Sequence, residues 1–114
     1  MTLALTESST VRLSTTGRGS VKLGPRRPNI KWTITSIAVT NDSTTRKPMA
    51  IVYVGNVGTA SQYHGTYSGD NDRTDADITL YSGEYITVEW TDGDIGSLSE
   101  AKITLTEDRD DALL

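Results

Sequence analysis

The feature that most limits what this chain can fold into is its succession of short runs in which β-branched residues alternate with polar ones. These runs are rich in threonine, valine and isoleucine, and glycine, asparagine, aspartate or proline separates one from the next. An alternation with a period of two is typical of half-buried β-strands, and no stretch shows a helical period long enough to predict a helix. The sequence therefore predicts an all-β protein.

The length and composition fit one small domain. The chain has 114 residues, of which 35% are hydrophobic, and it contains no phenylalanine and no cysteine. Its runs number about seven or eight, with the spacing of an antiparallel sandwich. We therefore expect a single-domain antiparallel β-sandwich of jelly-roll or Ig-like topology over residues 10–106, preceded by an N-terminal arm (1–9) and followed by an acidic C-terminal tail (107–114). Because such a core is modest and no disulfide supports it, a homo-oligomer is also expected.

Several local features of the sandwich can be predicted. Residues 11–23 resemble a β-hairpin with its turn at Gly17 and Gly19. The apolar phase changes after Ser36, which predicts a β-bulge or a corner there. The nearly continuous apolar stretch from Met49 to Val57 predicts a central strand.

The second half of the chain gives three more expectations. Residues 55–77 have no dominant period and are expected to form a long loop. Strands are predicted at 78–80, 84–90 and 101–106. The dipeptide Asp92-Gly93 is typical of a tight turn between the last two.

The charge balance argues against two classes of partner. The net charge is −4 and the pI about 4.8, whereas phosphate binding normally requires a basic face, so we expect no nucleic-acid ligand. No window approaches the roughly 20 apolar residues of a membrane span, so no membrane is expected either. The cations gather in two short segments, Arg26 with Arg27 and Arg46 with Lys47. They are either solvated loop charges or contacts to an acidic protein surface.

The residues that catalysis needs are scarce. General acid–base or nucleophilic catalysis requires a base beside a nucleophile, and the single histidine, His64, has no cysteine to accompany it. We therefore expect a protein that is not an enzyme and has no cofactor.

Four aspartates form the candidate metal site. Asp70, Asp72, Asp75 and Asp77 are closely spaced, and calcium prefers carboxylate and carbonyl oxygens on a loop. The run does not match the spacing of an EF-hand. The alternative is that these side chains stabilise turns through hydrogen bonds to their own backbone.

The tyrosines and the C-terminal leucines are candidate contacts to partners. Tyr63 and Tyr67 in particular, with Tyr81 and Trp90, supply the mixture of aromatic and polar groups that sugar-binding surfaces use, although the same residues could simply pack within a small β domain. The tail is acidic and then apolar, ending in Leu113 and Leu114. A free tail of this composition is typical of disorder, so we consider the leucines as contacts to a neighbouring molecule.

A spaced pattern of strand and turn sequences resembles a known group of proteins. The pattern covers about residues 10–106 and consists of VKLGP (21–25), KWTITSIAV (31–39), VYVG (52–55), GTYSGDND (65–72), SGEYITVEW (82–90) and GDIG (93–96). It is similar to small virion structural proteins of tailed phages that infect actinobacteria.

The resemblance implies a β-sandwich on the exterior of a virion, made in the host cytoplasm. One possibility is a capsid-decoration protein that docks on the major capsid protein, or on other virion proteins, and reinforces the shell. The alternative is a minor tail protein or host-binding module whose residues 55–77 and aromatics contact a cell-surface glycan. The resemblance carries no site motif, so it assigns no functional residue.

Overall fold

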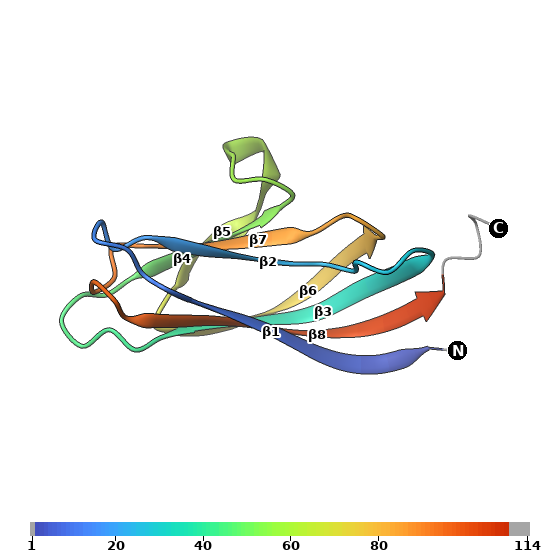
Figure 1. The fold of residues 1–114 in the computed structure, drawn as a ribbon, viewed down its shortest axis with the longest axis horizontal. Coiled ribbons are helices and arrows are strands. Elements are labelled where there is room, and N and C mark those ends of the chain that lie inside the picture. The colour runs from blue at the N-terminus through green and yellow to red at the C-terminus, as the bar shows by residue number, and fades with distance from the viewer. Residues whose placement is uncertain (1, 110–114) are drawn as a thin grey trace.

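The computed structural model describes residues 2–109, which form eight β-strands and one short 3-10 helix. The strands are β1 (Leu3–Arg12), β2 (Gly19–Leu23), β3 (Ile30–Asn41), β4 (Met49–Val54), β5 (Gln62–Ser68), β6 (Asn71–Tyr81), β7 (Ile86–Thr91) and β8 (Leu98–Arg109), and the 3-10 helix is η1 (Thr59–Ser61). They form the two layers of a sandwich that is about 50 Å long and 22–25 Å across (Figure 1). This architecture confirms the predicted antiparallel β-sandwich.

The strands pair in a nested order. One sheet has the order β1-β8-β3-β6 and the other β2-β7-β4-β5, and all pairs are antiparallel. The first strand therefore pairs with the last, the second with the seventh, the third with the sixth, and the fourth with the fifth. This is the double-sheet arrangement of an eight-stranded jelly roll rather than that of an immunoglobulin domain.

The core lies between the two sheets and is built mainly from aliphatic residues. Trp90 is fully buried, and its indole N–H donates to the Gly69 carbonyl at 3.2 Å. Trp32 is also buried at 7% exposure. The smaller side chains packed with them are Leu13, Val21, Leu23, Ile34, Ile37, Val39, Ala50, Val52, Ile78, Leu80, Ile86, Val88, Ala101, Ile103 and Leu105.

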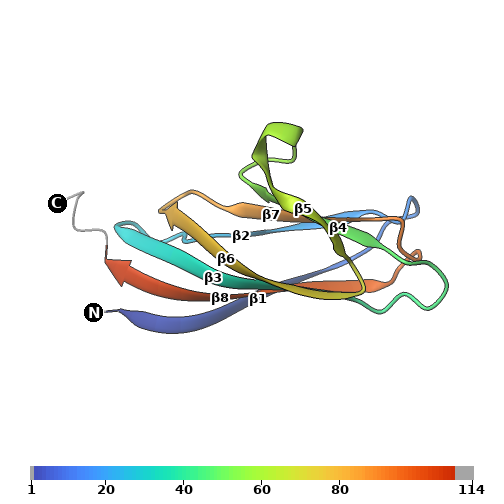
Figure 2. The ribbon, with the colours of Figure 1, turned by 180° about the vertical axis from the view of Figure 1, so that it is seen from behind.

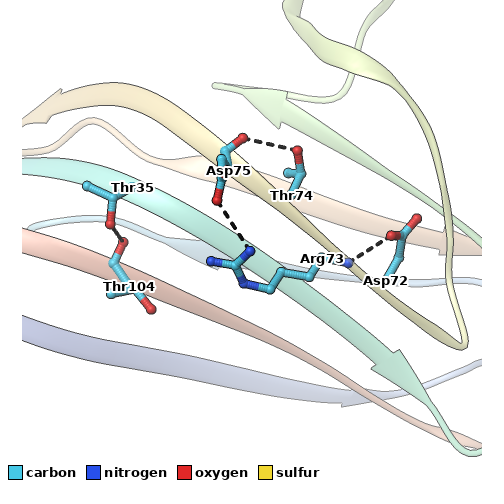
Figure 3. Close-up of polar contacts among 6 residues, drawn as sticks. All are labelled: Thr35, Asp72, Arg73, Thr74, Asp75 and Thr104. Atoms are coloured by element: carbon cyan, nitrogen blue, oxygen red, sulfur yellow. Dashed lines mark hydrogen bonds and ion pairs between the residues drawn. The ribbon is translucent and has the colours of Figure 1, made fainter.

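The predicted irregularity near Ser36 is confirmed. The register of β3 with both β6 and β8 shifts between Ile34 and Ser36. Trp32 and Ile34 face the core before this point, Ile37 and Val39 face it afterwards, and Thr35 is exposed. Thr35 donates its hydroxyl to the Thr104 carbonyl at 3.2 Å (Figure 3). The extra residue keeps both halves of β3 facing the core.

Position within the sheets confirms one further prediction and corrects two. β4 lies between β7 and β5, so the apolar stretch from Met49 does form a central strand. The predicted hairpin over residues 11–23 is wrong, because β1 belongs to one sheet and β2 to the other. Asp92-Gly93 likewise connects strands of different sheets. Local turn chemistry is the same whether the chain reverses within a sheet or crosses to the other one.

The predicted loop at 55–77 is also wrong in part. β5 and the first half of β6 occupy residues 62–68 and 71–77, and only residues 55–61 and the 69–70 turn connect strands. In β6 the polar residues alternate between exposed and half-buried. β5 and β6 are edge strands, and the first half of β6 has no fully buried residue. These segments therefore lack the apolar alternation by which a strand is predicted from sequence.

The sandwich extends beyond the residues assigned to it from the sequence. Residues 3–9, expected as an N-terminal arm, form most of β1 and pair with β8. Residues 107–109, expected as the start of the tail, complete β8, where Glu107 is buried. The remaining tail residues, with Leu113 and Leu114, lie outside the described part of the chain.

Deletion of Thr35 tests the importance of the bulge. Removing this residue would turn Ile37 and Val39 out of the core, or Trp32 and Ile34 instead, at a cost of about 5 kcal/mol. We expect the deletion to abolish cooperative unfolding in urea, followed by tryptophan fluorescence. The control Thr35→Ala preserves the length and should lower the free energy of unfolding by only about 1 kcal/mol. A deletion variant as stable as Thr35→Ala would contradict this account.

Candidate functional site

The connections between strands gather at the two ends of the sandwich. β1 begins and β8 ends at one end, together with the connections 24–29 and 82–85, whereas residues 13–18, 42–48 and 92–97 lie at the opposite end (Figures 1 and 2). We call these last three loops the tip. The connection at 55–61, which contains η1, projects from the body of the sandwich (Figure 2).

A single carboxylate organises the tip. Asp94 accepts hydrogen bonds from the backbone N–H groups of Thr44, Thr45 and Arg46, at 2.8, 3.0 and 2.9 Å. The Thr45 and Thr44 bonds are the main causes that hold the pKa of the Asp94 carboxyl below its ordinary value, and Arg46 contributes further. Asp94 therefore joins two loops that are about fifty residues apart in the sequence.

A set of buried and half-buried polar side chains also connects these loops. The Asn41 side-chain amide donates to the Ser97 and Ser99 hydroxyls at 3.0 and 2.7 Å. Its carbonyl oxygen accepts from the Ser43 amide at 2.8 Å. The Ser43 hydroxyl in turn accepts from the Asp94 backbone N–H at 2.9 Å. Because these groups satisfy one another away from water, the tip has a defined shape before any partner binds.

The first loop of the tip is fixed by backbone contact. The Leu13 amide donates to the Ser97 carbonyl and the Gly96 amide to the Leu13 carbonyl, both at 2.9 Å. Gly17 has a φ of +72°, and a Cβ atom there would lie 2.5 Å from the Gly93 oxygen. Only glycine allows the two loops to approach this closely.

The tip presents an exposed apolar side chain beside basic ones. Ile95 is 70% exposed, the largest value among the exposed large hydrophobic residues of the described chain. It borders an open cleft of about 460 Å³ that Arg46 also lines. Arg46 and Lys47 are exposed in the adjacent loop. An ordered, exposed apolar side chain beside a cation is suited to contact with a protein surface.

The other predicted basic pair lies at the opposite end. Arg27 forms an ion pair with Glu107 at 2.7 Å, and Trp32 donates its indole N–H to the same carboxylate at 2.9 Å. The Trp32 bond, followed by the Arg27 contacts, outweighs the effect of burial and lowers the pKa of Glu107. Arg27 therefore has a structural role, while Arg26 is exposed beside it.

Of the predicted tyrosines, Tyr81 is exposed, whereas Tyr63 and Tyr67 are not surface groups. Tyr63 and Tyr67 are half-buried in β5 and pack against the core. The Tyr63 hydroxyl accepts from the Asp77 amide at 3.1 Å. Burial, with the nearby Tyr63, raises the pKa of the Tyr67 hydroxyl. Tyr63 and Tyr67 therefore pack at the margin of the core, and Trp90 lies within the core.

The four candidate metal ligands are dispersed along β6 and its preceding turn. Asp70 accepts from the Ser68 hydroxyl at 2.8 Å, and Asp72 from the Ser68 amide at 3.0 Å. Asp75 instead pairs with Arg73 at 3.3 Å on the exterior (Figure 3). Asp77 is also exposed. Within residues 2–109, no group of three or more histidine, aspartate or glutamate side chains is placed to hold a metal ion.

Sequence reasoning missed the residues that matter most at the tip. The sequence does not identify Asp94 as an acceptor for distant backbone amides, and it does not single out Ile95. The one available signal was that Gly93-Asp94-Ile95-Gly96 places an isolated apolar residue within a polar turn.

His64, expected in a loop, lies in β5. No helix of the described chain is long and apolar enough to cross a membrane.

Comparison with known proteins finds similarity among solved structures only. No protein-family model matches the chain, and no curated protein sequence matches it. Among solved structures, one similar chain is a family two carbohydrate esterase from Cellvibrio japonicus, at 12% sequence identity and a TM-score of 0.32. The alignment covers 92% of this chain but only 35% of that protein. A TM-score this low does not establish a shared fold or function.

The role of Asp94 can be tested by amide hydrogen exchange. Asp94→Ala removes the acceptor of three backbone amides, so we expect the amides of Thr44, Thr45 and Arg46 to exchange faster. The core strands should keep their protection. The neighbouring substitution Asp92→Asn is the control, because it removes a charge from the same loop and asparagine also tolerates a positive φ such as the 62° found there. Equal exchange in both variants would exclude Asp94 as the organiser of the tip.

The lowered pKa of Glu107 predicts a pH-dependent contribution to stability. Because folding lowers this pKa, the contribution is present above the unfolded value of about 4.3 and is lost as the pH falls through the folded value. At neutral pH, Glu107→Gln should lower the free energy of unfolding by about 1–2 kcal/mol, since glutamine can still accept from Trp32 but cannot pair with Arg27.

Measuring the free energy of unfolding over a range of pH shows whether the charge of Glu107 causes this difference. The difference between wild type and Glu107→Gln should shrink as the pH is lowered below about 4, because the carboxyl then takes up a proton first in the unfolded chain and, at lower pH, in the folded one. Glu100→Gln removes a partly exposed carboxylate from the same strand and serves as the control. A constant difference between wild type and Glu107→Gln from neutral to acidic pH would refute this assignment.

Proposed function

We propose that this chain is a non-enzymatic structural protein of the exterior of a phage virion, and specifically a capsid-decoration protein. In this proposal it docks on the major capsid protein through its tip and reinforces the shell. The sequence resemblance to small virion proteins suggests the setting. The observation that carries the proposal is the exposed Ile95 on loops that Asp94 holds in place.

The physical properties of the tip suit a docking role. A contact surface that is ordered in advance loses less conformational entropy on binding than a flexible loop would. Ile95 offers an apolar anchor, and Arg46 with Lys47 would favour an acidic rim on the partner. The fold itself is compatible, since double-sheet jelly rolls occur in viral capsid proteins and also in lectins.

One observation favours the alternative of a minor tail or host-binding module that recognises a glycan. An open cleft of about 330 Å³ at the end opposite the tip is lined by Lys22, Arg26, Glu84 and Tyr85, among others. The Lys22 ammonium lies 4.7 Å from the centroid of the Tyr85 ring. Aromatic and charged groups around an open cleft are compatible with a sugar ligand.

Immunogold electron microscopy separates these functions. Phage particles that lack this chain are incubated with the purified protein, washed and labelled with an antibody to it. Decoration predicts label distributed over the head. Label confined to the tail tip would instead support the host-binding alternative, and no label on any part of the particle would overturn the virion assignment.

Variants at the two ends of the sandwich identify the docking surface in the same assay. Ile95→Asp should reduce labelling of the head by about tenfold or more, because it removes the apolar anchor and adds a charge that an acidic partner repels. Arg26→Glu changes the charge at the opposite end and should leave labelling unchanged. Equal labelling by both variants would exclude the tip as the docking surface.

A further inference from the structure

The two sheets have four edge strands, and three of them carry features that discourage further pairing. Edge strands leave backbone N–H and C=O groups available to another strand, and bulges, charges and short lengths protect them. β6 has a register shift and alternating charges, β5 has a register shift and a glycine, and β2 has five residues followed by Gly24-Pro25. These edges are protected against addition of a strand.

The fourth edge, β1, differs from the other three in being both long and regular. It has ten residues, and it pairs with β8 without a shift in register. It contains no proline, and its charged residues are Glu7 and Arg12. β1 is therefore the longest edge of the described sandwich that pairs with its neighbour in unbroken register.

Hydrogen bonds at the end of β1 define which of its backbone groups face outward. The Leu13 amide, just after β1, donates to the carbonyl of Ser97, just before β8. The carbonyl of the next residue, Leu98, points the other way, toward β3, and accepts from the Asp42 amide. Because backbone groups alternate direction along a strand, odd-numbered residues of β1 point toward β8. The even-numbered residues from Ala4 to Arg12 therefore direct their N–H and C=O groups to the free edge.

We propose that β1 pairs antiparallel with β1 of a second copy of this chain, about a twofold axis at Ser8. This register places Ser8 opposite Ser8, Thr6 opposite Thr10 and Ala4 opposite Arg12, so that outward-facing backbone groups meet. Leu5 then lies opposite Val11, which joins two apolar side chains on the core face. A register centred on Glu7 is disfavoured, because it places like charges directly opposite each other.

An open cleft beside β1 supports a second copy as the occupant. The cleft has a volume of about 310 Å³ and lies between β1 and β2. Glu7, Ser8 and Ser9 line one side of it, and Lys22 and Arg26 are also among its lining residues. The twofold operation at Ser8 brings a second Glu7 to this cleft, where the cations attract it. Pairing of the two β1 strands thus joins complementary charges as well as backbone groups.

Sedimentation equilibrium over a range of concentrations tests this dimer. The wild type should show a reversible monomer–dimer equilibrium below about 100 μM. Ser8→Lys places two cations opposite each other across the axis and should weaken the dimer by about fivefold, more at low salt. Ser20→Lys is the matched control, because Ser20 is an exposed serine on the edge strand β2. It should leave the dissociation constant unchanged.

A second variant removes the backbone contact itself. Ser8→Pro eliminates an N–H group that faces the free edge, so the ladder between β1 and β8 keeps its hydrogen bonds while the dimer is lost. Circular dichroism confirms the fold of each variant, and Ser8→Lys decides the question if Ser8→Pro does not fold. A wild type that is monomeric throughout, or a dimer that Ser8→Lys and Ser20→Lys affect equally, would overturn the proposal. Neither result bears on capsid docking through the tip.

Discussion

The bulge at Thr35 is the constraint on which the rest of the structure depends. β3 is a central strand of its sheet and pairs with both β6 and β8, so its phase determines which side of its neighbours meets the core. A regular strand of this sequence would bury the apolar residues of one half and expose those of the other. One additional residue resolves this conflict and allows a long strand to cover the core along the whole sandwich.

The tip depends on a different principle, in which backbone groups of separate loops are satisfied by a few polar side chains. Asp94 supplies most of this connection, and the buried amide and hydroxyl groups of Asn41, Ser97 and Ser99 complete it. The free energy for ordering the loops is therefore already provided by folding. A partner that contacts Ile95 gains from this preorganisation, which is the physical link between the fold and the docking role that we propose.

Sequence patterns predicted the sandwich, the bulge and the central position of β4. Those features depend on burial, which leaves a period in the sequence. The pairing of the strands could not be predicted, because Gly17 and Asp92-Gly93 suit a crossing between sheets as well as a hairpin. The tip could not be assembled either, since the acceptor Asp94 and the amides it binds come from distant loops whose proximity follows only from the topology.

The nested pairing also has a consequence for how the chain reaches its native state. Only β4 and β5 are adjacent both in sequence and in a sheet, and each surrounding pair closes a longer segment, up to the pair of β1 with β8. Closing long segments before their contacts form is slow, so folding that starts at the β4–β5 hairpin and proceeds outward avoids the largest entropic cost. Of the eight strands, the one that is synthesised first, β1, would then be the last to join its sheet.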